Sequence, residues 1–305
     1  MHPKYPHLPI IALWSRLLVG VLALLPALAT AQEGEAEDEV KIADNSFLVE
    51  EAYNQEAGIV QHIFNFVPSW ERGPNARRNF DVLFTQEWPV FSQRHQLSYA
   101  VPLRRFDESP PAGGGAEGGG LGDILLSYRY QLSNGEDGRL PFACAPRASL
   151  IFPSGDVEKG LGDGKLGYQF NLPISKEFAR WAFHFNAGLT KIPGSRAGVD
   201  PLVSFAGRDL DGYNLGASAI YFLKPNFHLM LETVALWDDE LEADGAERHL
   251  FQSVVSPGFR WAPYTEGDTQ WVLGMGLPIG ISSDAPDIGI IFYMSFEHRF
   301  LKTAR

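Results

Sequence analysis

The sequence predicts an all-β fold, an antiparallel transmembrane β-barrel of about twelve strands. The first observation is an alternation of apolar and polar residues that holds from Ile59 to Phe300, as in Phe80–Thr85 and Trp181–Asn186. A period of two places successive side chains on opposite faces of a strand. In a barrel the apolar face would contact lipid, whereas in a soluble exported β-sandwich, the competing fold, it would form the core.

The second observation is an N-terminal stretch, residues 1–31, with the layout of a cleaved signal peptide. Lys4 and Arg16 supply a basic start, Leu17–Leu28 is apolar, and Ala29-Thr30-Ala31 is a small-x-small cleavage site. Twelve apolar residues are too few for a helix to cross about 30 Å of hydrocarbon. An exported chain without a later apolar helix must enter a membrane as a closed barrel, because every backbone polar group in lipid needs a partner.

The third observation is that the loops between the predicted strands are by turns long and short. Outer-membrane barrels have long external loops, short periplasmic turns and periplasmic termini, and a soluble sandwich has no reason to sort its loops. The predicted strands are residues 58–67, 78–88, 95–106, 121–132, 141–152, 165–172, 180–191, 212–223, 227–237, 249–261, 270–281 and 288–300. Long loops are predicted at 68–79, 107–120, 153–164, 192–211 and 238–248; the last external loop, 282–287, is short.

Composition excludes some functions. Removal of residues 1–31 leaves 23 basic and 37 acidic side chains, a net charge of −14, which argues against a nucleic-acid partner. Cys144 is the only cysteine, so the chain forms no intramolecular disulfide.

Residues 32–57 form an acidic lead-in to a barrel that spans residues 58–305. Its first part is polar and acidic and predicts disorder. Asn45 or Ser46 could cap a short helix, with Glu50 and Glu51 near its positive N-terminal end. This stretch is either a plug or periplasmic latch, or a connecting turn packed on the barrel rim.

Aromatic and proline residues fit the same barrel. The aromatic residues near the predicted strand ends favour a girdle at the lipid–water boundary, with ordinary core aromatics as the alternative. These are Trp88, Phe106, Trp181, Trp237, Trp261 and Trp271. Each proline inside a predicted strand removes a ladder donor and predicts a bulge or a strand end. These prolines are Pro102, Pro146, Pro257 and Pro278.

The final strand resembles the C-terminal signal that the barrel-assembly machinery reads in outer-membrane proteins. It ends at the aromatic Phe300, and Phe292, Met294 and Phe296 precede it at alternate positions. Two departures are the polar His298 and the residues 301–305 that follow the aromatic. Expected partners are therefore this machinery, outer-membrane lipid and lipopolysaccharide.

The chain contains two glycine-rich units. The first is Gly118–Tyr130, a glycine-rich loop and strand, and the second combines Gly160–Gly164 with Leu166–Tyr168. These units resemble those of a family of outer-membrane transporters named for the meta-cleavage pathway of phenol degradation. The resemblance covers the chain from about Ile59 to its C-terminus. It implies an outer-membrane barrel that passes small organic molecules, and it supplies no catalytic residues.

No catalytic, cofactor or metal site is predicted. Gly164-Lys165 lacks the Ser or Thr of a phosphate-binding loop, and Gly113–Gly122 has no flanking βαβ unit. The histidines show no His-x-x-x-His pair, and Asp209–Gly212 is only a fragment of a calcium loop. An acidic run either holds divalent cations at the lipopolysaccharide surface or is a solvated loop; it comprises Asp238, Asp239, Glu240, Glu242, Asp244 and Glu247.

The face opposite the apolar side carries the candidate functional residues of the lumen. Six of its charged side chains are basic and five are acidic, and His184 lies among them. They either form ion pairs that stiffen a narrow barrel or line a polar path for a solute. The candidates are Asp81, Glu87, Arg104, Asp123, Arg129, Arg147, Lys165, His184, Glu232, Arg260, Glu297 and Arg299.

The sequence therefore predicts an outer-membrane channel or uptake protein, not an enzyme, for small organic molecules, aromatic ones among them. One alternative is a structural or assembly-associated barrel without transport. Another is an outer-membrane lipid hydrolase, but no serine lies suitably near His184 in the sequence.

Overall fold

A computed structural model describes residues 42, 44–71, 76–108, 117–200 and 203–300, which all belong to a compact unit that begins at Val40. The predicted signal peptide, residues 32–41 of the acidic lead-in and the C-terminal residues 301–305 lie outside the described residues. Among the described residues, no helix has the length and apolar character needed to cross a membrane.

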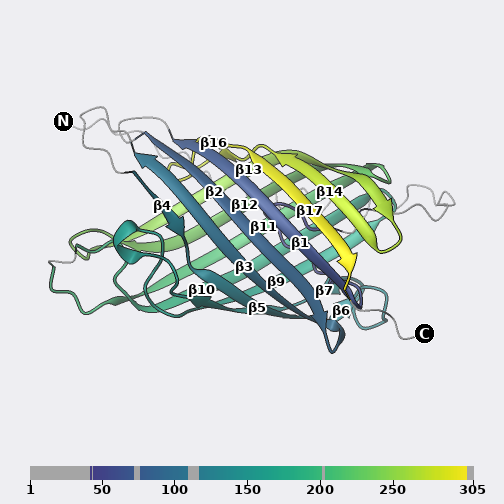
Figure 1. Ribbon diagram of the computed structural model, residues 1–305, viewed down its shortest axis with the longest axis horizontal. Coiled ribbons are helices and arrows are strands. Elements are labelled where there is room, and N and C mark those ends of the chain that lie inside the picture. Colours follow the sequence, from purple (N-terminus) through teal and green to yellow (C-terminus); the bar gives the residue numbers. More distant parts are fainter. Residues whose placement is uncertain (1–41, 43, 72–75, 109–116, 201–202, 301–305) are drawn as a thin grey trace. The chain divides into compact units, whose positions relative to one another are not determined.

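The described structure is almost entirely antiparallel sheet (Figure 1). Its strands are β1 (Ile59–Glu71), β2 (Arg77–Val90), β3 (Ser92–Glu108), β4 (Glu117–Leu121), β5 (Ile124–Tyr130), β6 (Ser133–Asn134), β7 (Ala143–Cys144), β8 (Arg147–Phe152), β9 (Gly167–Phe178), β10 (Trp181–Ser195), β11 (Arg208–Lys224), β12 (Phe227–Leu241), β13 (Glu247–Glu266), β14 (Thr269–Gly276), β15 (Ile279–Gly280), β16 (Ile288–Gly289) and β17 (Ile291–Arg299). The 3-10 helix η1 (Val157–Lys159) lies in the loop before β9.

The sheet closes on itself. Neighbours in sequence pair with each other, and the first strand β1 pairs with the last strand β17 from Ile59↔Arg299 to Phe66↔Phe292. Some short strands continue one another: β4 and β5 both pair with β3, β7 and β8 with β9, β14 and β15 with β13, and β16 and β17 with β1. β6 continues β5 in the same way, because β5 pairs with β8 and β6 with β7. Counted in this way, the wall has twelve strands, as the sequence predicts.

Strand ends differ from the predictions at both ends of the barrel, because the strands are longer than predicted. The predicted loop 68–79 shrinks to residues 72–76, and 238–248 shrinks to 242–246, because the hairpins continue as paired strands. Backbone pairing needs no apolar side chains, so a hairpin can continue beyond the apolar part of its strands. The turns at the other end are tight, with two residues between β9 and β10 and two between β11 and β12.

The two faces of the wall have opposite chemistry. Phe170 is 57% exposed and Leu215 53% exposed on the outer face, whereas Glu232 and Arg260 are buried inside. On β10, the buried His184 lies between the outward Phe183 and Phe185. A single closed sheet with an exposed apolar exterior is suited to lipid and not to water. The soluble β-sandwich is therefore wrong.

The four strand prolines lie at interruptions of the wall. Pro146 and Pro278 stand between short strands, at the predicted strand ends. Pro102 and Pro257 remain in register, with Leu83 and Leu231, but on their other side the neighbouring strand is broken. There the Gly122 N–H donates to the Pro102 carbonyl and the Leu277 N–H to the Pro257 carbonyl.

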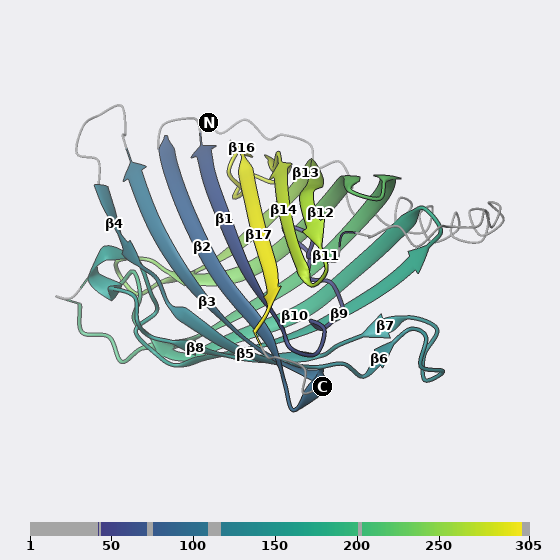
Figure 2. The same cartoon turned by 45° about the vertical axis from the view of Figure 1, so that its right-hand side comes forward.

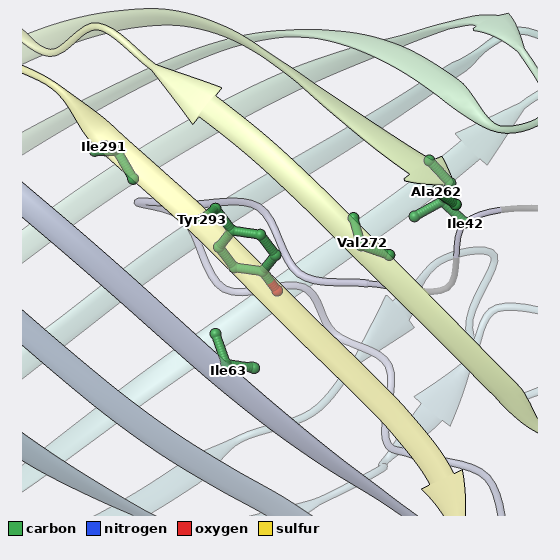
Figure 3. Packing of buried hydrophobic residues seen from close by; sticks show 6 residues of the cluster. All are labelled: Ile42, Ile63, Ala262, Val272, Ile291 and Tyr293. Carbon is green, nitrogen blue, oxygen red and sulfur yellow. The ribbon is translucent and has the colours of Figure 1, made fainter. Parts of the chain in front are cut away.

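A cluster of apolar side chains lies inside the barrel. It consists of Ile63, Ala262, Val272, Ile291 and Tyr293 from the wall and Ile42 from the chain before β1 (Figure 3). The presence of Ile42 in this cluster shows that the chain preceding the first strand enters the lumen.

Candidate functional site

The lumen is occupied by the chain's own residues Asp44–Gln55, here termed the inner segment. It runs behind β1, β17 and β14 within the barrel (Figure 2), and it contacts wall residues from β3 to β17. Val49 is 1% exposed and Ala52 is 0% exposed. The short helix expected from Asn45 or Ser46 is not formed; residues 47–49 and 52 are bends. Backbone groups that a helix would satisfy internally are bonded to the wall instead.

Glu232 on β12 binds three consecutive backbone groups of the inner segment. Its carboxylate accepts the N–H groups of Phe47 (3.3 Å), Leu48 (2.9 Å) and Val49 (3.1 Å). Hydrogen bonds to a charged acceptor are among the stronger ones in proteins, and a buried group left unpaired is costly. Glu232 therefore anchors the first half of the segment.

Glu50 is bound by three side chains from the opposite part of the wall. Arg129 Nη1 donates to Oε1 (3.0 Å) and Asn171 Nδ2 donates to Oε2 (2.9 Å), while Arg147 forms an ion pair with Oε2 through Nε at 3.2 Å. Burial acts to raise the pKa of Glu50, but the charges of Arg147 and Arg129 outweigh it and lower the pKa below its ordinary value. Asn186 fixes the backbone here, accepting the Glu50 N–H and donating to its carbonyl.

Glu51 and Ala52 contact a polar cluster on β9, β10 and β13. Arg260 Nη1 lies 3.0 Å from Glu51 Oε1, and His184 Nε2 lies 3.6 Å from the same oxygen. The Ser175 hydroxyl oxygen accepts the Ala52 N–H at 2.8 Å and lies 2.7 Å from His184 Nδ1. No serine was expected near His184, and Ser175 on the neighbouring strand corrects that expectation. The side chains of Ser175 and His184 are both fully buried.

Asp44 is held where the segment enters the apolar cluster. Its carboxylate accepts from Gln61 Nε2 (2.6 Å), from Ser295 Oγ (2.5 Å) and from the Tyr293 hydroxyl. Burial dominates over these hydrogen bonds and over the charge of Arg260, and it raises the pKa of Asp44 to about 6. Asp44 and Glu50 thus have pKa values shifted in opposite directions on one short segment.

Phe47 fits into a slot that glycines create in the wall. A Cβ added at Gly274 would lie 2.3 Å from Phe47 Cζ, and one at Gly276 would lie 3.2 Å from the ring. The ring packs against Tyr293 at a centroid separation of 4.9 Å. Glycine is required here because any larger side chain would occupy the space of the ring.

The twelve lumen candidates separate into three groups. Six surround the inner segment: Glu87, Arg129, Arg147, His184, Glu232 and Arg260. The sequence could not indicate their partners, because alternation shows which face of a strand a side chain lies on and not which distant residue it contacts. The uncharged lumen residues Ser175, Asn171 and Asn186 share this phase and could have been identified from it.

The other six candidates lie toward the two ends of the barrel. At the long-loop end, Arg104 pairs with Asp81 at 2.7 Å, and Asp123 accepts the N–H groups of Gly155 and Asp163. Lys165 is exposed in the loop before β9 and does not line the lumen. At the turn end, Arg299 pairs with Asp268 at 2.5 Å, and Glu297 is half-buried two positions before it.

A cavity of about 630 Å³ adjoins the inner segment at the turn end. It is lined by Tyr53, Asn54 and Glu56 and by wall residues that include Arg94 and Gln131. The cavity shows that the segment fills the bore at its own level without filling the whole barrel.

One group of metal-ligand type lies at the long-loop end. Asp239, Glu247 and His249 offer ligand atoms within 4.8 Å of one another. His249 Nδ1 already lies 2.6 Å from Asp239, and Arg208 pairs with Glu247 at 2.7 Å. Protein partners therefore occupy ligand atoms from the predicted acidic run.

No protein-family model matches the sequence, and no curated protein sequence matches it significantly. The resemblance to the meta-cleavage transporter family thus stays a prediction. Among solved structures, an outer membrane channel from Pseudomonas putida F1 is similar, with 12% identity over 87% of this chain and 99% of that one and a TM-score of 0.58.

Two further similarities are weaker. The transport unit of the autotransporter AIDA-I from Escherichia coli matches at 11% identity over 92% of this chain and 98% of that one, with a TM-score of 0.48. The CymD monoaromatic hydrocarbon channel matches at 11% identity over 81% and 90% of the two chains, with a TM-score of 0.38. At these identities the first match supports the fold alone and the other two carry no argument. The chain has the fold of outer-membrane barrel proteins.

Proposed function

We propose that the protein is an outer-membrane channel for small organic molecules that its own inner segment closes at rest. The supporting observation is the polar lumen whose donors and acceptors are matched to a stretch of chain that is not part of the wall. A barrel whose role was only structural would gain nothing from a segment attached through buried polar contacts. Apolar packing gives stability without the desolvation cost of burying charge.

Weakening the attachment of the inner segment tests this proposal. Glu232→Gln keeps the shape of the side chain and replaces one acceptor oxygen with a donor that faces the N–H groups of residues 47–49. The loss should be about 1–3 kcal/mol, which corresponds to a rise of about 5- to 150-fold in the ratio of open to closed channels. Single-channel recording in planar bilayers measures that ratio.

The controls separate opening from misfolding. Glu158→Gln changes an exposed glutamate in η1 and should leave the conductance unchanged. Phe47→Ala weakens the attachment through lost packing in the glycine slot, not through lost hydrogen bonds, and should also increase opening. Each variant must keep heat-modifiable migration in gels, the property of a closed barrel. If Glu232→Gln and Phe47→Ala both fold and open no more often than Glu158→Gln, the protein is a structural barrel and the proposal is wrong.

A further inference from the structure

The inner segment occupies a binding site that the wall would present to a solute once the segment leaves. Charged side chains on the wall of a lumen ordinarily form ion pairs with other side chains of the wall. Here the wall arginines Arg129, Arg147 and Arg260 are balanced by carboxylates Glu50 and Glu51, which belong to the segment. Withdrawal of the segment would therefore leave basic groups behind on the wall.

The formal charges around the inner segment show what its withdrawal would leave in the lumen. The wall contributes the three arginines and the carboxylates Glu87 and Glu232, a formal charge of +1. The segment contributes Asp44, Glu50 and Glu51 and brings the formal charge to −2. The open lumen therefore favours an anion at the position that the Glu50 carboxylate occupies in the closed lumen.

The Glu50 position has the geometry of a carboxylate site. Its two oxygens receive separate hydrogen-bond donors, Arg129 at 3.0 Å on one side and Asn171 at 2.9 Å on the other, and Arg147 forms an ion pair on the Asn171 side at 3.2 Å. Arg147 Nη2 also donates to Gln169 Oε1 at 3.0 Å, so the wall itself orients this guanidinium. Arg129 lies 3.9 Å from Glu87, which also belongs to the wall. These groups remain when Glu50 departs.

We propose that Arg129, Arg147 and Asn171 form a binding site for small organic carboxylates, which Glu50 occupies in the closed state. This inference rests on the proposed function and names its substrate class. The group that occupies the site in the closed state is a carboxylate that contacts Arg129, Asn171 and Arg147. Benzoate, a small organic carboxylate, is therefore the first probe, with benzamide as its neutral match of equal size.

Binding is measured first, on the full-length protein in detergent by calorimetry. Glu50→Gln removes the internal competitor and should bind benzoate at least about tenfold more tightly than the wild type does. Adding Arg147→Gln should abolish that gain, whereas adding Arg105→Gln, at an exposed position on β3, should preserve it. Benzamide should not bind. Equal binding of benzamide and benzoate, or tighter binding of inorganic phosphate than of benzoate, would overturn the carboxylate assignment.

Transport is measured second, in proteoliposomes that contain Phe47→Ala, which leaves the carboxylate site intact. Benzoate should enter several-fold faster than benzamide, and Arg147→Gln should remove the difference. An open channel that passes both probes equally refutes the carboxylate site and leaves the channel function standing. Benzoate binding to a barrel that never conducts refutes the channel function and leaves the site standing.

Discussion

At the scale of single residues, the inner segment carries two carboxylates whose pKa values are shifted in opposite directions. Glu50 lies between arginine charges that lower its pKa, and Asp44 is buried among neutral donors in a position that raises its pKa to about 6. Alternation predicted that Arg129, Arg147, Glu232 and Arg260 face the lumen. Their partners in the inner segment lie 75 or more residues away along the chain, which no local pattern reveals.

We expect Asp44 to make closure of the channel tighter at acidic pH. Its pKa is about 6 in the closed state against an ordinary value of 3.8, so its contribution to closure is complete below the ordinary value and is lost as the pH rises through 6. The contribution of Glu50 to closure is lost as the pH falls, because its pKa is lowered, and this loss occurs below the ordinary pKa of a glutamate. Single-channel recordings at pH 5, 6 and 7.5 should show more opening at the higher values.

Asp44→Asn provides the control for that titration, because the amide has no charge to lose. The variant should show a clearly flatter change in open probability between pH 5 and 7.5 than the wild type. A variant with the wild-type pH profile would exclude Asp44 as a contributor.

At the scale of strands, the period of two predicted nearly everything and the capping signal predicted nothing. The twelve wall strands and the phase of β10 follow from alternation, since the outer face is apolar and most of the inner face is polar. Asn45 and Glu50 have the residue types of a helix start, but wall side chains bind the backbone and carboxylates of this stretch. Local propensity is weak compared with such contacts.

The outward face of β11 offers a direct test of the lipid boundary. Leu215 is near the middle of the strand and 53% exposed, and Leu223 is near its turn and similarly exposed. Leu215→Arg should cost about 2–4 kcal/mol and Leu223→Arg about 0–1 kcal/mol, because the penalty falls toward the interface. Reversible urea titration in lipid vesicles measures both values. Equal losses would show that this face does not lie in hydrocarbon.

At the scale of the whole barrel, different contacts close the wall and fill the bore. The wall closes through β1 and β17, and the bore closes through contacts of the inner segment with strands on all sides. Alternation, loops and terminal strand predicted the closed wall. The filled bore depends on buried contacts between the segment and distant strands, and only the complete structure shows them.

A covalent lock should hold the bore closed without disturbing the wall. A Cβ on Gly216 would lie 3.1 Å from Val49 Cγ2, so cysteines at both positions are within reach of a disulfide. In a Cys144→Ser background, the oxidised Val49→Cys/Gly216→Cys protein should show almost no opening, even with Glu232→Gln added. Reduction should restore the opening. An oxidised protein that conducts as well as the reduced one would place the pore elsewhere.

The join between the inner segment and the wall determines how the bore would open. Only Glu56, Ala57 and Gly58 separate the segment from β1, a span of at most about 10 Å. One end of the segment is therefore fixed beside the β1–β17 junction. Asp44 at the other end is bound to Gln61 of β1 and to Tyr293 and Ser295 of β17, so both ends lie at the same junction. The side chains that contact Glu50 come from β5, β8 and β9, in another part of the wall. On opening, the middle of the segment would move away from these three strands, and an entering anion would meet their side chains on the uncovered wall.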